Sequence, residues 1–321
     1  MITLVSVPGT GGAPIFESFP AGALTDPMLA ARGQCWGRPL GLNWRFFFVT
    51  YPAAVFPMEP SWRQGIENTV GAVQMSPGFF VLDGYSQGAT VVARVWRDEI
   101  LNPAGRLHNR LNDCLGVITY GPPLRSPGLA FGNTIICGIP VPPPIEGFVT
   151  GGIAGPDCLT AAQCYFPAGH PLAGQVAVYD HAAPGDLYGS CPIGTNPWAA
   201  SWKADCPIGY DENLAYGIIQ NFTVATIAPM VTTAATDLGI AIGSGVNLPL
   251  LIELGVDAIE AAAGAPLSIP ATGVSGVGQL VGLVVALVNG GMFLIQGTAP
   301  HGNYDSGPAT GWLIELGKRY A

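Results

Sequence analysis

The stretch Phe79–Trp96, FFVLDGYSQGATVVARVW, decides the fold class of this chain. It begins as an apolar run, passes through the five residues GYSQG centred on Ser86, and continues with residues of helical composition. Glycine on both sides of the serine lets a strand and a helix approach closely around a strained turn. The stretch therefore predicts a buried strand, a tight turn at Ser86 and a helix.

This context is the one in which the pattern G-x-S-x-G presents a nucleophilic serine in α/β-hydrolases. Because five residues alone recur by chance, an ordinary glycine-rich turn is the alternative. A serine hydroxyl is a weak nucleophile at neutral pH, so it needs a histidine base that a carboxylate orients. In this fold class the three residues follow one another as serine, acid and histidine.

The chain has four histidines, and His301 is the favoured base because it lies in a loop just before the predicted closing helix 309–319. His108 sits in a polar stretch, and His170 lies between a glycine and a proline in an irregular region. Both are more simply structural or solvated. His181 follows a predicted strand, but it precedes the acid candidate.

Asp186 is the favoured acid because it lies on the loop after a predicted strand, from which its carboxylate can reach a histidine. Asp180 is the alternative, although a structural hydrogen bond at the end of the strand explains it more simply. A turn-capping role is the plainer interpretation of either residue.

Two backbone N–H groups are expected to bind the oxyanion of the tetrahedral intermediate. The residue after the nucleophile, Gln87, supplies one. Thr10 is the choice for the other, with Gly11 as the alternative, because both lie in a glycine-rich loop after the first predicted strand. Such a loop can also hold phosphate, but the chain has neither G-x-G-x-x-G nor a P-loop lysine there.

The order of apolar runs and helical stretches predicts an α/β domain with a mostly parallel sheet. The expected strands are 2–7, 45–50, 79–83, 116–120 and 175–179, the expected helices are 61–74, 89–101 and 309–319, and residues 125–174 are expected to be irregular. We expect the catalytic core to comprise residues 1–211 and 298–321. Residues 212–297, rich in small apolar side chains, are expected to form an inserted helical subdomain. Within it, residues 277–296 are almost long and apolar enough to cross a bilayer; a lid helix is favoured because no basic residues flank the segment.

Composition limits the kinds of partner. Of the 321 residues, 49% are hydrophobic and only 10% charged, and the net charge is −9. With only twelve Lys and Arg residues, the chain is not expected to bind nucleic acid, and its low charge favours apolar partners. The first seven residues form an apolar run without a basic start, so we expect a strand there and not a secretory signal.

Seven cysteines leave two possibilities open. Cys158 with Cys164, and Cys191 with Cys206, are close enough in sequence to close short disulfide loops, or the cysteines are buried and reduced. No paired C-x-x-C zinc spacing is present, and neither a metal nor another cofactor is expected.

Taken together, these segments resemble the cutinase-like serine esterases, and within them the lysin B enzymes of mycobacteriophages. The matching pieces occur in the family's order, and the third and fifth make the resemblance more specific than GYSQG alone. They are Gly9-Thr10, Gly84–Gly88, Tyr120–Gly128, Pro184–Tyr188 and Pro300–Tyr304.

The resemblance implies a Ser86, Asp186 and His301 triad that hydrolyses the ester between mycolic acids and arabinogalactan in the mycobacterial envelope. It also implies an inserted helical subdomain between the acid and the histidine, and a phage-encoded protein made in the host cytoplasm. Two alternatives stay open: a cutinase or lipase acting on other fatty esters, and a virion-associated protein that binds envelope lipid on a hydrolase scaffold.

Overall fold

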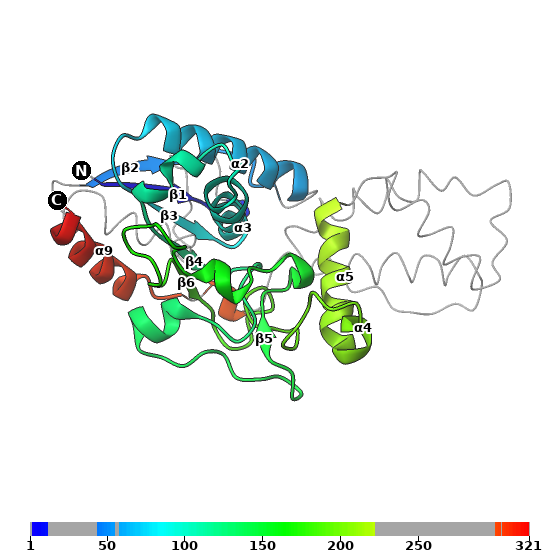
Figure 1. Cartoon of the computed structure of the whole chain (residues 1–321). Helices are drawn as coiled ribbons and strands as arrows, with labels where there is room; N and C mark the ends of the chain where they lie inside the picture. Colours follow the sequence, from blue (N-terminus) through cyan, green and yellow to red (C-terminus); the bar gives the residue numbers. More distant parts are fainter. Residues whose placement is uncertain (1, 12–43, 55–57, 222–298, 303, 321) are drawn as a thin grey trace, which may run out of the picture. The chain divides into compact units, whose positions relative to one another are not determined.

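Five parallel strands form the central sheet, in the order β2-β1-β3-β4-β6 (Figure 1). The structure is a computed structural model that describes residues 2–11, 44–54, 58–221, 299–302 and 304–320. The strands are β1 (Ile2–Val7), β2 (Trp44–Phe48), β3 (Phe80–Tyr85), β4 (Cys114–Tyr120) and β6 (Val178–His181). Every residue of β1 and β4 is buried, as expected for strands covered on both faces.

Helices cover both faces of the sheet (Figure 1). Helices α2 (Met58–Met75) and α3 (Gln87–Arg94) lie on one face, and α3 continues as a π-helical segment, η1 (Val95–Leu101). Helix α9 (Gly307–Tyr320) packs on the other face. Its buried residues Ala309, Leu313 and Leu316, spaced by four and three, contact a core that includes Ile2 and Leu4 of β1.

The remaining described elements are short, apart from helix α5 (Pro207–Asn221). Residues 125–174 contain mostly loop, as the sequence predicted. The short elements are η2 (His108–Asp113), η3 (Gly132–Cys137), η4 (Gly155–Asp157), η5 (Ala161–Cys164), α4 (Trp202–Asp205) and η6 (Ala299–Gly302), together with the antiparallel pair β5 (Thr150–Gly151) and β7 (Cys191–Pro192).

The chain divides into two compact units, one formed by Met1–Asn213 with Gly297–Ala321 and the other by Leu214–Gln296. Almost all of the second unit lies outside the described residues, and so does the apolar stretch 277–296. The inserted helical subdomain therefore stays a prediction. In the described part of the chain, no helix has the length and apolar character needed to span a membrane.

The last strand of the sheet differs from its predicted bounds of 175–179. Strand β6 pairs with β4 only from Val178 onward. The residues before it pair elsewhere, because Val176 forms a bridge with Tyr165 and the amide of Ala177 donates to the carbonyl of Cys164. His181 is therefore the last residue of the strand and does not follow it.

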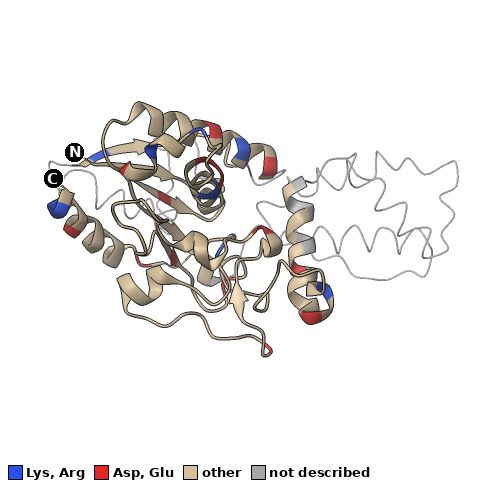
Figure 2. Ribbon diagram, viewed as in Figure 1, with Lys and Arg blue, Asp and Glu red and all other residues tan. Residues whose placement is uncertain are grey.

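Charged side chains are sparse over the described ribbon (Figure 2). The six cysteines in the described residues are all free thiols, so neither of the two short-loop disulfides is formed. Burial raises the pKa of the Cys114 thiol to about 12. Cys35 lies outside the described residues.

Candidate active site

Strands β1, β3, β4 and β6 end at the same edge of the sheet, and the candidate site lies there. The register pairs Val7 with Gly84, Tyr85 with Tyr120, and Tyr120 with His181. The chain passes from β1 outward to β2 and then back to β3 on the other side of β1. Ligands of open parallel sheets bind beside the carboxyl ends of the strands at such a change of direction.

Ser86 occupies the sharp turn between β3 and α3, with φ 56° and ψ −116°. Its amide donates to the carbonyl of Tyr120 at 2.9 Å. A Cβ atom at Gly84 would lie 2.4 Å from the carbonyl oxygen of Gly88, and one at Gly88 would lie 2.1 Å from the carbonyl oxygen of Val7. Both glycines are therefore required for the close approach of strand and helix, and this part of the predicted turn is confirmed.

His301, in η6, faces the serine. Its Nε2 atom lies 2.9 Å from Ser86 Oγ. The hydroxyl of Tyr85 donates to the backbone carbonyl of His301 at 2.9 Å, and the Tyr85 ring stacks on the imidazole with centroids 5.2 Å apart. The ring of Tyr188 contacts the same imidazole at 4.7 Å. These contacts fix the position and plane of a histidine that is far from the serine in sequence.

Asp186 lies on the other side of the imidazole and is completely buried. Nδ1 of His301 lies 2.9 Å from Oδ1 and 3.0 Å from Oδ2 of the carboxylate. The amide of Tyr188 donates to Oδ1 at 2.9 Å, and the hydroxyl of Tyr304 donates to Oδ2. The structure therefore brings together all three residues that the sequence selected for the triad.

The environment of Asp186 favours its ionised form. Burial alone would raise the pKa of this carboxyl, but the hydrogen bonds from His301, Tyr304 and Tyr188 outweigh it and lower the pKa below the ordinary value. A carboxylate is a hydrogen-bond acceptor only, so it selects the tautomer that carries its proton on Nδ1. The Nε2 atom that faces Ser86 is then free to accept the hydroxyl proton.

Gln87 is the first residue of α3, where backbone N–H groups have no partner within the helix. Both the nitrogen and the oxygen of its side-chain amide form hydrogen bonds. Nε2 donates to the carbonyl of Ala54 at 2.8 Å and lies 3.4 Å from Thr10 Oγ1, and Oε1 accepts from Ser61 Oγ at 2.9 Å. These bonds connect the turn at Ser86 to the segment after β2 and to α2, and the Thr10 contact connects it to the loop after β1.

The hydrogen bonds of the loop after β1 distinguish the two candidates for the second oxyanion donor, Thr10 and Gly11. The amide of Gly11 donates to the carbonyl of Ala53 at 2.9 Å, so it is already used within the protein. The Tyr51 hydroxyl supports the same loop through a 2.7 Å bond to the carbonyl of Pro8. This geometry favours Thr10 over Gly11, and the role itself stays a prediction.

The other candidates from the sequence make structural hydrogen bonds. Ring nitrogens of His108 and His170 contact backbone carbonyls at 2.9 and 3.1 Å. Nδ1 of His181 lies 3.0 Å from the carbonyl of Thr119, whose hydroxyl donates to the carboxylate of Asp180. Within the described residues, no group of three or more His, Cys, Asp or Glu side chains is arranged to hold a metal ion.

Arg125 and Tyr304 were in the segments that carry the resemblance, but the sequence assigned neither a role. Arg125 is completely buried. Its guanidinium donates to the carbonyl of Gly189, to that of Leu129 at 2.7 Å and to Thr150 Oγ1 at 2.9 Å. The sequence signal for a structural role was an isolated arginine within an otherwise uncharged Gly/Pro-rich stretch. Arginine is seldom fully buried unless it has partners.

The strand order, the helices on both faces and the serine turn together define an α/β-hydrolase fold. No known family profile matches the chain. Two curated proteins are similar to the chain in sequence. Endolysin B of Mycobacterium phage L5 is 37% identical over 133 residues, which are 40% of this chain and 48% of that protein. Endolysin B of Mycobacterium phage D29 is 34% identical over 145 residues, 43% of this chain and 52% of that protein.

The chain is homologous to these two proteins over that shared stretch, which spans about half of their length. A crystal structure of lysin B from mycobacteriophage D29 superimposes with a TM-score of 0.52 and 23% identity, covering 97% of this chain and 98% of the other. That similarity shows a shared fold, in agreement with the fold class predicted from the sequence.

Proposed function

We propose that the protein is a serine esterase that hydrolyses lipid esters, with the ester between mycolic acid and arabinogalactan as its substrate. The observation that carries the proposal is the continuous hydrogen-bond chain from Ser86 Oγ through His301 to Asp186. Its setting at the carboxyl edge of the sheet, on a strained serine turn, is what acyl transfer requires.

The residues have the following roles in this proposal. Ser86 Oγ attacks the carbonyl carbon of the ester while His301 Nε2 takes the hydroxyl proton. The N–H groups of Gln87 and Thr10 bind the oxyanion. Collapse of the tetrahedral intermediate breaks the C–O bond, and His301 returns the proton to the departing alcohol. A water molecule then hydrolyses the acyl-enzyme by the same steps, and Asp186 stabilises the imidazolium each time.

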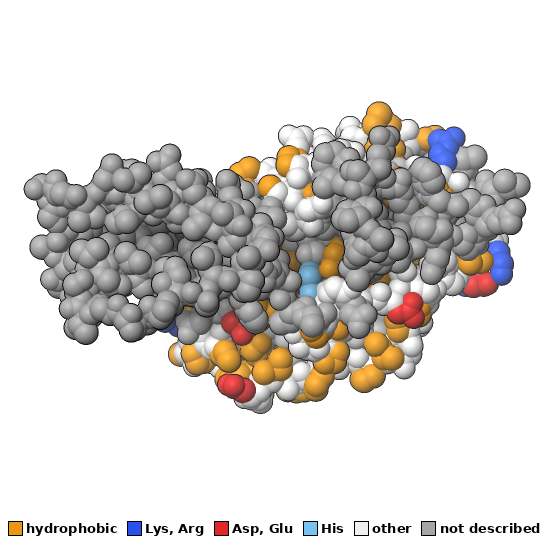
Figure 3. All heavy atoms as spheres, turned by 180° about the vertical axis from the view of Figure 1, so that it is seen from behind, with side chains coloured by type: hydrophobic (Ala, Val, Ile, Leu, Met, Phe, Trp, Pro, Cys, Tyr) orange, Lys and Arg blue, Asp and Glu red, His pale blue; other side chains and the backbone are white. Residues whose placement is uncertain are grey.

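Support for an apolar substrate comes from the surface near the acid loop. The amide side chain of Asn133 forms two hydrogen bonds with the backbone of Ala182, at 2.7 and 3.0 Å, four residues before Asp186. The segment fixed in this way presents Ile135 and Ile139, which are 53% and 49% exposed. On the face shown in Figure 3, the described surface carries hydrophobic and uncharged side chains with few charged ones.

Support for the envelope ester comes from the relatives, whose names are those of endolysins of mycobacteriophages. On this proposal the chain is phage-encoded and acts on the host cell envelope. A cutinase or lipase would use the same triad, so the choice between substrates depends on the products that are released.

The triad is tested with Ser86→Ala and a short-chain nitrophenyl ester. We expect kcat to fall by roughly a thousandfold or more, because the nucleophile is removed, while circular dichroism and the melting temperature stay close to those of the wild type. A fluorophosphonate probe should label the wild type at the peptide that contains Ser86 and should not label the variant. Equal turnover by the two proteins would overturn the triad, and failure of the probe on folded wild type would favour the lipid-binding alternative.

The substrate is tested by incubating the wild type with purified mycolyl-arabinogalactan and, separately, with triacylglycerol emulsions. Release of free mycolic acid at a higher kcat/KM than release of fatty acid supports the envelope ester. The reverse preference would support the cutinase or lipase alternative.

A further inference from the structure

The hydroxyl of Tyr304 connects the segment that carries the histidine with the loop that carries the acid. It donates a hydrogen bond to Asp186 Oδ2 and accepts one from the backbone amide of Ala183 at 3.1 Å. His301 precedes Tyr304 by three positions in the chain. The same segment therefore contacts Asp186 twice, once through the imidazole and once through the phenol.

This contact helps to fix the orientation of the Asp186 carboxylate. Nδ1 of His301 is almost equidistant from the two oxygens, at 2.9 and 3.0 Å, so this bond alone does not select a rotation of the carboxylate. The terminal torsion of an aspartate is broad. The Tyr188 amide binds Oδ1, and the Tyr304 hydroxyl provides the corresponding bond on Oδ2.

Packing holds the phenol in place. The Tyr304 ring packs against the core beside Tyr120, with ring centroids 5.9 Å apart. Burial and the neighbouring Asp186 carboxylate raise the pKa of the Tyr304 phenol well above its ordinary value, so the hydroxyl keeps its proton at neutral pH. A protonated phenol is a hydrogen-bond donor toward an ionised carboxylate.

We infer that Tyr304 is a positioning residue of the esterase site, which acts by holding the Asp186 carboxylate in line with His301. The inference rests on the proposed function. It assigns the Pro300–Tyr304 segment two tasks: placing the base and fixing the acid that orients the base.

The test compares Tyr304→Phe, which keeps the ring and removes the hydroxyl, with Tyr179→Phe as a matched control. Tyr179 is on β6 with its ring against Trp312. For Tyr304→Phe we expect kcat on a short-chain nitrophenyl ester to fall roughly 10- to 100-fold, as for loss of a hydrogen bond to a charged group, with KM changed by less than about twofold. Labelling of Ser86 by a fluorophosphonate should slow by the same factor. The control should keep the wild-type kcat.

Two further variants separate positioning from a general structural effect. In an Asp186→Asn background, Tyr304→Phe should cost no further activity, because the carboxylate that Tyr304 positions is already absent. With 3-fluorotyrosine at position 304, which retains the donor, kcat should stay within about twofold of the wild type.

The inference is overturned if Tyr304→Phe keeps the wild-type kcat, if its loss is the same in the wild-type and Asp186→Asn backgrounds, or if 3-fluorotyrosine is as damaging as phenylalanine. In each of these cases an active, probe-labelled wild type leaves the proposed function intact. A folded wild type that neither hydrolyses esters nor reacts with the probe overturns the proposed function, and this inference with it.

Discussion

Gly121 determines how closely the loop after β4 approaches the imidazole of His301. It has φ 55°, and a Cβ atom there would lie 2.5 Å from Cε1 and 2.7 Å from Nδ1 of the ring. Gly121→Ala must therefore displace the imidazole from Asp186 or from Ser86. We expect kcat on a nitrophenyl ester to fall at least about tenfold, because misplacing reacting groups by about 1 Å costs up to about 100-fold.

Gly128→Ala is the matched control for this variant. Gly128 has φ 69°, and its Cβ atom would meet only Val149 Cγ1, at 3.4 Å. Both variants carry the backbone strain of a left-handed alanine, about 1 kcal/mol, and both should lower the melting temperature by a few degrees. Only Gly121→Ala should lose activity. A comparable loss in both would mean that strain, and not crowding of the imidazole, is responsible.

The triad residues were predictable because two constraints acted together. The chain offers four histidines, and the expected order of serine, acid and histidine leaves His301 as the one that follows both. The supporting residues were not predictable in the same way. Tyr304 contacts Asp186 across 118 positions of the chain, and Gly121 lies against the ring of the distant His301, so spacing along the sequence does not reveal these contacts. The catalytic roles stay predictions until the variants are measured.

The central strands were predictable because strands buried on both faces are continuous apolar runs, as in β1 and β4. Their exact ends were not, because an end depends on the pairing partner: β6 begins where β4 becomes its neighbour. Residues 125–174 resisted assignment for a related reason. The amide of Ile153 donates to the carbonyl of Tyr188, and the buried Arg125 side chain donates to the carbonyl of Gly189.

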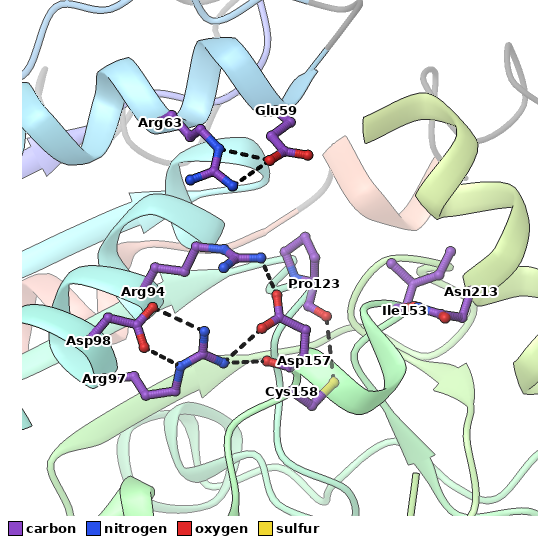
Figure 4. Close-up of polar contacts among 10 residues, drawn as sticks. All are labelled: Glu59, Arg63, Arg94, Arg97, Asp98, Pro123, Ile153, Asp157, Cys158 and Asn213. Carbon is purple, nitrogen blue, oxygen red and sulfur yellow. Dashed lines mark hydrogen bonds and ion pairs between the residues drawn. The ribbon is translucent and has the colours of Figure 1, made fainter. Parts of the chain in front are cut away.

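Asp157 connects the nucleophile helix to the loop region through a compact ion network (Figure 4). Its carboxylate pairs with Arg94 of α3 and with Arg97 of η1, the latter at 2.9 Å, and Arg97 also binds the Asp157 carbonyl at 2.7 Å. The two arginine side chains are only 21% and 17% exposed. Arg94 also lies over the ring of Trp62, 4.1 Å from its centroid.

Asp157→Asn should therefore reduce the free energy of unfolding by roughly 1–2 kcal/mol, because two partly buried guanidinium groups lose the Asp157 carboxylate, and within the described part of the chain only Arg97 keeps another one, that of Asp98. Urea unfolding at low ionic strength measures the change, and about 1 M salt should reduce it. Glu59→Gln is the control: its partner Arg63 is 65% exposed, so the cost should stay below about 0.5 kcal/mol. Equal changes for the two variants would show that the Asp157 network acts as ordinary surface pairs.

Two adjacent buried residues, Asp180 and His181, give the stability of the whole fold opposite dependences on pH. Burial raises the pKa of Asp180 to about 6 from 3.8, despite the Thr119 hydroxyl and the Arg125 charge. Because the folded pKa is raised, this contribution to stability is complete below about pH 3.8 and is lost as the pH rises toward 6. Burial lowers the pKa of His181 to about 4 from 6.5, so its contribution is complete above about pH 6.5 and is lost as the pH falls toward 4.

Each contribution is worth about 3 kcal/mol over its range, at about 1.4 kcal/mol for a tenfold change in proton affinity, and the two nearly cancel in the wild type. Asp180→Asn removes the contribution that decreases as the pH rises. Between pH 4 and pH 6.5 the free energy of unfolding of this variant should therefore increase by about 3 kcal/mol more than that of the wild type. His181→Gln should show the reverse trend. Urea unfolding gives, for each protein, the change in the free energy of unfolding between pH 4 and pH 6.5. Any cost of the substitution that does not depend on pH cancels from this change. Curves parallel to the wild type would mean that the pKa of neither residue differs between the folded and the unfolded chain. The amide of Gly121 donates to the carbonyl of His181 at 3.0 Å. The end of β6, which contains both titrating residues, therefore also supports the loop against which His301 packs.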